Sequence, residues 1–112
     1  MTGGSVAMSQ TRVDAYEVFY SSNSFAPRIG LKNAGVFVGQ MIFMPNGTQL
    51  PPDASVNGQV NLYYRLDDFQ NAIDLLRNEK PIYLYFNGSG GNENGIKTMT
   101  EKVGEGEIAP DK

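Results

Sequence analysis

The chain has 112 residues, of which 40% are hydrophobic and 11% aromatic, a composition that predicts one folded domain rather than a disordered chain. It contains neither cysteine nor histidine, which excludes disulfides, thiolate metal sites, cysteine nucleophiles and histidine-based acid–base catalysis. A formal net charge of −3 gives the chain as a whole no general attraction to nucleic acid or to anionic membranes.

The beginning of the chain is small and polar, and we expect residues 1–10 to be disordered. It shows neither a basic cluster nor an apolar run, so no secretion signal is expected and a cytoplasmic protein is predicted. No apolar run approaches the roughly 20 residues that a membrane-spanning helix needs. We therefore expect a single domain over residues 11–103, followed by an acidic, frayed tail over residues 104–112.

Residues that favour β-structure dominate the first part of this domain. Residues 13–20 alternate without a cleanly apolar face, which predicts an outer strand. A short strand with Arg28 and Lys32 on one side is expected next. Residues 35–44 are apolar on both faces, which suits a strand covered on both sides, or one with a helix on one face and a partner subunit on the other. Gly39 within them predicts a bulge or a close approach to the backbone.

The clearest pattern follows a stretch at residues 45–58 that is rich in proline and asparagine and predicts a long exposed loop. Residues 60–66 alternate between apolar and polar side chains, which predicts a strand with one buried face. The spacing then changes to i, i+3, i+4 and i+7, the pattern of one helical face, in Phe69, Ala72, Ile73 and Leu76. We expect a helix over about residues 67–79 that Pro81 prevents from continuing.

Two neighbouring carboxylates, Asp67 and Asp68, stand at the start of this helix. A catalytic acid–base pair would need them to converge, but successive side chains on a helix point about 100° apart. We expect instead that Asp67 caps the helix, with Gln70 completing a pair that resembles a capping box.

Two further strands are predicted, at residues 82–86 and, as a charged edge strand, at residues 96–103. The glycine-rich and asparagine-rich residues 87–95 between them predict a mobile hairpin loop. This loop and Lys97 nearly match a phosphate-binding loop. That motif needs its lysine directly after the glycine and a helix behind it, so no nucleotide site is expected here.

These elements predict an α+β fold, in which an antiparallel sheet of five or six strands carries one α-helix on one face. If the apolar residues of the strands flanking the helix point toward it, the alternate residues point away. The far side of the sheet would then present Tyr63, Arg65, Tyr83 and Tyr85, with Arg28, Lys32 or Lys97 beside them. Single-stranded nucleic acid stacks on aromatic rings interleaved with cations, whereas a second subunit or a curled strand would bury the same face.

The order of elements in residues 27–79 is several strands, a central strand marked by Gly39, and a strand that enters a helix through Leu66-Asp67-Asp68-Phe69. This order resembles the β-β-β-β-α unit of the Whirly-type single-stranded-DNA-binding transcription regulators and related coactivators. The resemblance implies an oligomer that presents its sheet to nucleic acid. The acidic net charge and the two strands after the helix depart from that family, and none of its functional residues is carried over.

We predict a non-catalytic binding or assembly module that forms a homo-oligomer, in the simplest case a homodimer, through the sheet face opposite the helix. The alternative is a protein that binds single-stranded nucleic acid with the same face. Because histidine and cysteine are absent and no acid pair converges, an enzyme is not expected. Neither a cofactor, nor a metal ion, nor a membrane partner is expected. The predicted binding residues are Tyr63, Arg65, Tyr83, Tyr85, Arg28 and Lys32.

Overall fold

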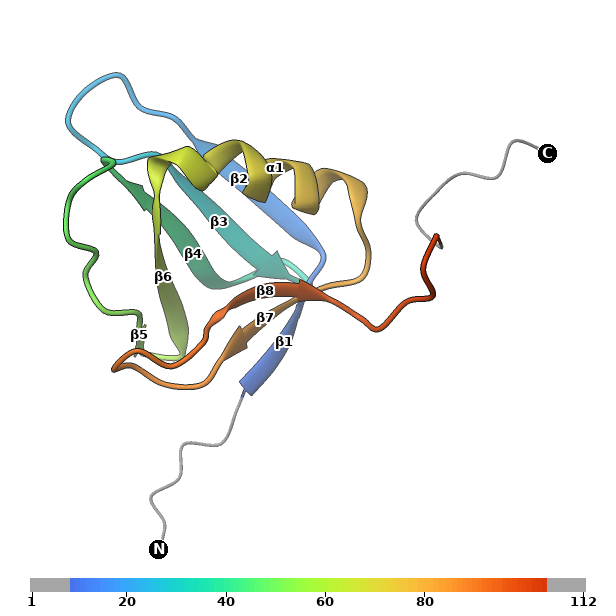
Figure 1. The fold of residues 1–112 in the computed structure, drawn as a ribbon. Helices are drawn as coiled ribbons and strands as arrows, with labels where there is room; N and C mark the ends of the chain where they lie inside the picture. Colours follow the sequence, from blue (N-terminus) through green and yellow to red (C-terminus); the bar gives the residue numbers. More distant parts are fainter. Residues whose placement is uncertain (1–8, 105–112) are drawn as a thin grey trace, which may run out of the picture.

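The computed structural model describes residues 9–104, which form two β-sheets and one α-helix (Figure 1). The expectations for residues 1–8 and 105–112 lie outside this part of the chain. The strands are β1 (Ser9–Val13), β2 (Ala15–Phe19), β3 (Arg28–Asn33), β4 (Val36–Met44), β5 (Ala54–Val56), β6 (Gln59–Arg65), β7 (Ile82–Phe86) and β8 (Gly95–Thr98). Between β6 and β7, the 3-10 helix η1 (Leu66–Asp68) leads into α1 (Phe69–Asn78). The α+β class is confirmed, and the helix lies close to its predicted position.

The larger sheet has five strands in the order β2-β3-β4-β6-β5. All neighbours in it are antiparallel except β4 and β6, which run parallel. The parallel pair arises because residues 45–53 carry the chain back along the sheet, so that β6 starts from the same end as β4. Within the stretch predicted as a loop, Asn57 and Gly58 (φ 53° and 80°) turn β5 back into a hairpin with β6. The expectation of a wholly antiparallel sheet is therefore wrong at this pair.

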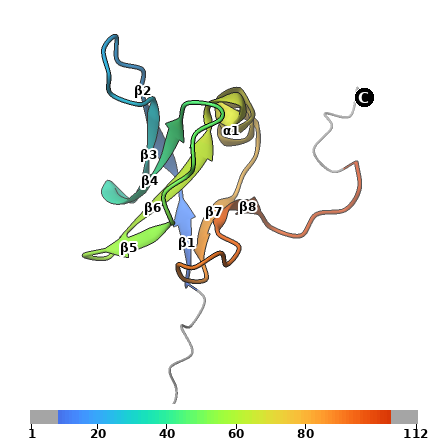
Figure 2. The ribbon, with the colours of Figure 1, turned by 60° about the vertical axis from the view of Figure 1, so that its left-hand side comes forward.

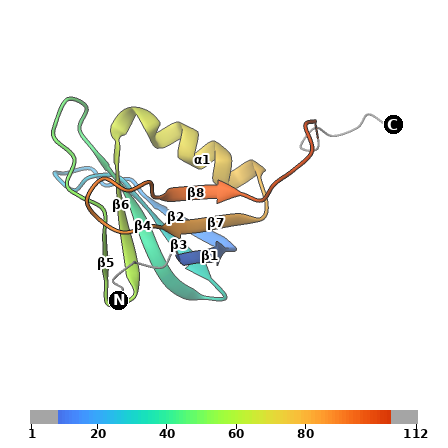
Figure 3. The ribbon, with the colours of Figure 1, turned by 60° about the horizontal axis from the view of Figure 1, so that its bottom comes forward.

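The smaller sheet has three antiparallel strands in the order β1-β7-β8, which Figure 3 shows side by side below α1. Strand β1 includes residues 9 and 10, which were expected to be disordered. The single sheet predicted from the sequence is thus divided in two. Strand β7 extends a separate sheet, because its hydrogen-bonded neighbours are β1 and β8 and not a strand of the larger sheet.

The chain passes from one sheet to the other at Asp14. Val13 is paired with β7 of the smaller sheet, whereas Ala15 is paired with Lys32 of the larger one. The backbone N–H of Asp14 donates to the carbonyl of Lys32 at 2.9 Å, which ties the crossing to β3. The outer strand predicted at residues 13–20 is therefore two strands, one in each sheet.

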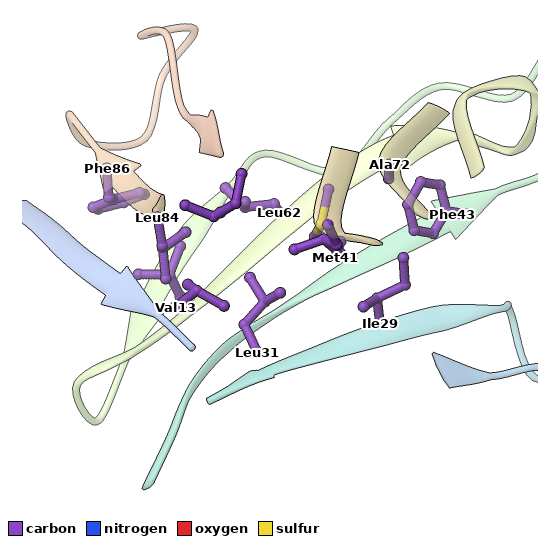
Figure 4. Packing of buried hydrophobic residues seen from close by; sticks show 12 residues of the cluster. Val13, Ile29, Leu31, Met41, Phe43, Leu62, Ala72, Leu84 and Phe86 are labelled. Atoms are coloured by element: carbon purple, nitrogen blue, oxygen red, sulfur yellow. The ribbon is translucent and has the colours of Figure 1, made fainter. Parts of the chain in front are cut away.

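The core lies between the larger sheet on one side and both α1 and the smaller sheet on the other (Figure 2 and Figure 4). The larger sheet contributes Ile29, Leu31, Met41, Phe43, Val60 and Leu62. The smaller sheet contributes Val13, Ile82, Leu84 and Phe86, and the helix contributes Ala72 and Leu76. The period-two patterns flanking the helix are thus confirmed except at Leu66, which lies in η1 and is exposed. Of the predicted helical face, Phe69 and Ile73 are half-buried and pack against this cluster.

Gly39 lies where the two sheets meet. The pairing of β3 with β4 shifts between Leu31 and Lys32, and Val38 is the extra residue of this irregularity. A Cβ atom on Gly39 would lie 2.6 Å from the carbonyl oxygen of Val60 and 3.1 Å from Cδ2 of Leu84. The close approach predicted at Gly39 is thus confirmed, and the irregularity lies at the adjacent Val38.

The start of the helix differs from the predicted capping box. Asp68 precedes α1 and makes no side-chain capping hydrogen bond. The Asp67 carboxylate instead accepts from Nδ2 of Asn46 at 2.8 Å, and Oδ1 of Asn46 accepts from the Asp67 backbone N–H at 3.1 Å. Gln70 donates to Asp74 at 2.9 Å. Because η1 precedes the helix, the side chain of Asp67 bonds the turn after β4 rather than the first turn of α1.

Candidate functional site

The six residues predicted to share one sheet face lie on two different sheets. Four of them belong to the five-stranded sheet: Arg28, Lys32, Tyr63 and Arg65. The other two, Tyr83 and Tyr85, belong to β7 of the three-stranded sheet. The expectation of one shared face is therefore wrong, and there are two faces to consider. A role of these residues in binding stays a prediction.

The uncovered face is the side of the five-stranded sheet that points away from the core, and neither a helix nor the second sheet covers it in the described part of the chain (Figure 2). Strand pairing places four side chains in one row across it: Phe19, Arg28, Ile42 and Tyr63. Phe37 and Met44 of β4 lie on the same face. All of these side chains are half-buried, because they pack on one another and on the sheet.

Two phenylalanine rings of the uncovered face meet over Gly30. A Cβ atom on Gly30 would lie 3.2 Å from Cε1 of Phe37 and 3.7 Å from Cε1 of Phe19. Because Gly30 has no side chain, both rings can pack against the backbone of the sheet at this position. These rings were not predicted as part of a binding surface, although Phe19 and Phe37 lie within runs whose residues favour β-structure.

The polar groups of the uncovered face have partners within the chain. Lys32 forms an ion pair with Glu17 at 3.7 Å, and the guanidinium carbon of Arg28 lies 4.4 Å from the centre of the Phe19 ring. The guanidinium of Arg65 donates to the carbonyl of Thr48. Nε2 of Gln40 donates to Oδ1 of Asn61 at 3.1 Å. Of the three predicted cations of this face, Lys32 is thus paired with a carboxylate, and the two arginines are held by neutral groups of the chain.

The outer face is the side of the three-stranded sheet that points away from the core. Strand pairing aligns Arg12, Tyr83 and Lys97 in one row across β1, β7 and β8, and Gln10, Tyr85 and Gly95 in the next row. Arg12 and Lys97 are exposed. Among residues 9–104 the one ion pair joins Lys32 to Glu17, so neither Arg12 nor Lys97 is paired with a carboxylate there.

Glu93 lies at one end of the outer face. The hydroxyl of Tyr85 donates to a Glu93 carboxylate oxygen at 3.1 Å. Burial and this hydrogen bond raise the pKa of Tyr85 above its ordinary value. The row of Tyr85 therefore has an acidic neighbour, whereas the row of Tyr83 has a cation on each side.

A hollow of about 630 Å³ adjoins the outer face where β1 ends. Its lining includes the cations Arg12, Arg77 and Lys80 and the acids Asp14 and Glu79. Arg12 thus belongs both to the hollow and to the row of Tyr83. Arg12 was not among the predicted binding residues, although its place beside Val13 in a β-forming run was a signal that it lies on a strand.

The two loops whose roles the sequence left open are bonded to each other through Asp53. Its carboxylate accepts from the backbone N–H of Tyr63 at 2.9 Å and from Nδ2 of Asn94 at 3.0 Å. Its carbonyl accepts from the hydroxyl of Ser89 at 2.6 Å. Asn94 in turn accepts from the backbone N–H of Asn87 at 2.6 Å. Asp53 therefore holds the loop before β5 against the loop between β7 and β8.

A narrow groove of about 330 Å³ runs between α1 and β8, and Tyr64, Leu75 and Ile96 are among its lining residues. The Tyr64 ring stacks on Phe43 with 5.4 Å between ring centres. Burial raises the pKa of Tyr64 far above its ordinary value, and the nearby Asp53 carboxylate adds to the rise. Tyr64 therefore stays protonated at alkaline pH values at which an exposed tyrosine loses its proton.

Comparison with protein-family models, with curated proteins and with solved structures finds no match to this chain. The likeness of its element order to Whirly-type proteins stays a prediction. In residues 9–104 no three acidic, histidine or cysteine side chains are grouped so that they could hold a metal ion. The described part of the chain also has no helix with the length and apolar character needed to cross a membrane.

Proposed function

We propose that this chain is a non-catalytic assembly module that forms a homo-oligomer through the uncovered face of the five-stranded sheet. One observation carries the proposal. Phe19, Phe37, Ile42, Met44 and Tyr63 gather on a sheet face over which the described chain places no other element. Removing apolar surface from water contributes about 25 cal/mol per Å², and a specific interface buries about 800 Å² on each partner.

A second copy fits this face better than a nucleic acid does. Phosphates would need cations free to reach them, but Lys32 is paired with Glu17, and the guanidinium groups of Arg28 and Arg65 are held on the Phe19 ring and the Thr48 carbonyl. Two sheets packed face to face interdigitate their side chains across about 10 Å, which suits rings that stand on a pleated surface. In a dimer with twofold symmetry, Glu17 of one copy can also lie opposite Lys32 of the other copy, and Lys32 opposite Glu17, so that opposite charges face each other.

The test is the mass of the full chain in solution, measured by light scattering over a wide range of concentration. We expect a homo-oligomer for the wild-type chain. Phe37→Ser should shift it toward monomer, because it removes one of the two rings over Gly30. The matched control is Val36→Ser, which changes the adjacent residue of β4, whose side chain points to the other side of the sheet. A wild-type chain that stays monomeric at the highest concentration would contradict the proposal.

A further inference from the structure

The outer face of the three-stranded sheet differs from the uncovered face in its charges. Tyr83 lies between Arg12 on β1 and Lys97 on β8, each directly opposite it in the pairing. Neighbouring strands lie about 4.8 Å apart, so the backbones that carry the two cations are roughly 10 Å apart, with the strand of Tyr83 between them. Neither has a carboxylate partner in residues 9–104. The row therefore offers positive charge on both sides of an aromatic ring.

The two tyrosines of this face are spaced along a single strand. Tyr83 and Tyr85 are separated by one residue of β7, which places them on the same side about 6.7 Å apart. Both rings are half-buried, so their positions are fixed by the sheet while part of each ring stays accessible. Gln10 lies opposite Tyr85 and adds hydrogen-bonding groups without charge.

Positive charge continues beyond the sheet at the end where Arg12 stands. The adjoining hollow brings in Arg77 and Lys80, against Asp14 and Glu79. The opposite end carries Glu93, bonded to the hydroxyl of Tyr85. A negatively charged ligand is therefore favoured over the row of Tyr83 and toward the hollow, and disfavoured past Tyr85.

We propose that the outer face binds single-stranded nucleic acid, with bases stacked on Tyr83 and Tyr85 and phosphates beside Arg12 and Lys97. Stacking needs accessible rings on a rigid support, and phosphates need cations without internal partners. The outer face combines the two, whereas the cations of the uncovered face are engaged. This inference is independent of self-association, since it uses a different sheet.

The experiment titrates the full chain against fluorescein-labelled oligothymidylate and oligouridylate at several salt concentrations. We expect binding at low salt that weakens steeply as salt rises. In an Arg12→Gln/Lys97→Gln variant, the plot of log K against log[salt] should become less steep, its negative slope being smaller in magnitude by about 1.4. Each phosphate contact on a single strand contributes about 0.7 to that magnitude, and the variant loses two contacts. Tyr83→Leu should weaken binding by about tenfold through the loss of stacking.

Matched variants separate the site from general effects. Lys102→Gln removes the same charge as Lys97→Gln from a lysine beyond the end of β8, and we expect it to leave binding unchanged. Tyr20→Leu is the control for Tyr83→Leu, because Tyr20 is 75% exposed and lies in neither row. Circular dichroism of each variant verifies that it is folded.

Three outcomes would overturn the proposal. The first is that the folded wild-type chain does not bind the oligonucleotide at low salt. The second is that Lys97→Gln and Lys102→Gln lose the same amount of affinity. The third is that thymidine monophosphate displaces the labelled oligonucleotide at the same nucleotide concentration as unlabelled oligonucleotide does. The last would identify a free nucleotide as the sufficient ligand. If Phe37→Ser abolishes self-association and leaves oligonucleotide binding intact, the two proposals are separated and this one is supported.

Discussion

Leu84 of β7 packs directly on Gly39 of β4, so that the two sheets meet at a position without a side chain. The Cδ2 atom of Leu84 lies 3.1 Å from the place that a Cβ of Gly39 would occupy, and the carbonyl oxygen of Val60 lies closer still at 2.6 Å. The flexible end of a leucine can yield, but the carbonyl belongs to the paired strand β6. The close pairing of β4 with β6 therefore requires a glycine at position 39, and the packing of Leu84 on this position adds to that requirement.

We expect Gly39→Ala to lower the free energy of unfolding by about 3 kcal/mol, at the upper end of the range for overpacking, because the added methyl group meets backbone. Chemical denaturation of the purified chain measures this. The matched control is Gly30→Ala, whose methyl group would meet ring atoms of Phe37 at 3.2 Å and no backbone. Those rings lie on the uncovered face and can shift, so Gly30→Ala should cost clearly less. Equal losses would show that the contact with the Val60 carbonyl does not set the cost of a methyl group at position 39.

Asp53→Ala should loosen both loops at once. The substitution leaves the backbone N–H of Tyr63 and the side-chain amide of Asn94 without their acceptor. Leaving a part-buried donor without its charged acceptor lowers the free energy of unfolding by about 1–3 kcal/mol. We expect chemical denaturation to show a decrease in this range. Hydrogen exchange should become faster in residues 87–94 as well as in the loop before β5. Ser55→Ala is the control, since this exposed neighbour is not bonded to the second loop. Faster exchange in one loop alone would contradict the coupling.

The sequence predicted the segment around the helix well because its patterns are local. Alternation at residues 60–66 and 82–86 and the helical spacing of Phe69, Ala72, Ile73 and Leu76 specify which side of each element is apolar. Alternation does not specify the neighbouring strand. Strand β7 needs an apolar face if it joins the larger sheet, and it also needs one if it belongs to a second sheet that packs on the larger sheet. The division into two sheets therefore could not be inferred from these residues.

The candidate site shows the same limit. The alternation of β7 correctly indicated that Tyr83 and Tyr85 point away from the core, but not which cations stand beside them. Arg12 and Lys97 come from opposite ends of the chain and are brought to Tyr83 only by strand pairing. Likewise, the parallel pairing of β4 with β6 depends on the path of residues 45–53, which have no periodic pattern.

Tyr64 makes the stability of the fold depend on pH in the alkaline range. Burial, and then the carboxylate of Asp53, raise its pKa well above the ordinary tyrosine value of 10.0, so the folded chain keeps this phenol protonated when the unfolded chain loses the proton. Stability is therefore unaffected below pH 10 and falls above it, by about 1.4 kcal/mol per pH unit from this group. Tyr64→Phe should remove this part of the fall in denaturant unfolding measured between neutral pH and pH about 11. Tyr20→Phe, at an exposed tyrosine, should keep the wild-type slope. Parallel curves for Tyr64→Phe and wild type would show that the folded chain does not protect this phenol.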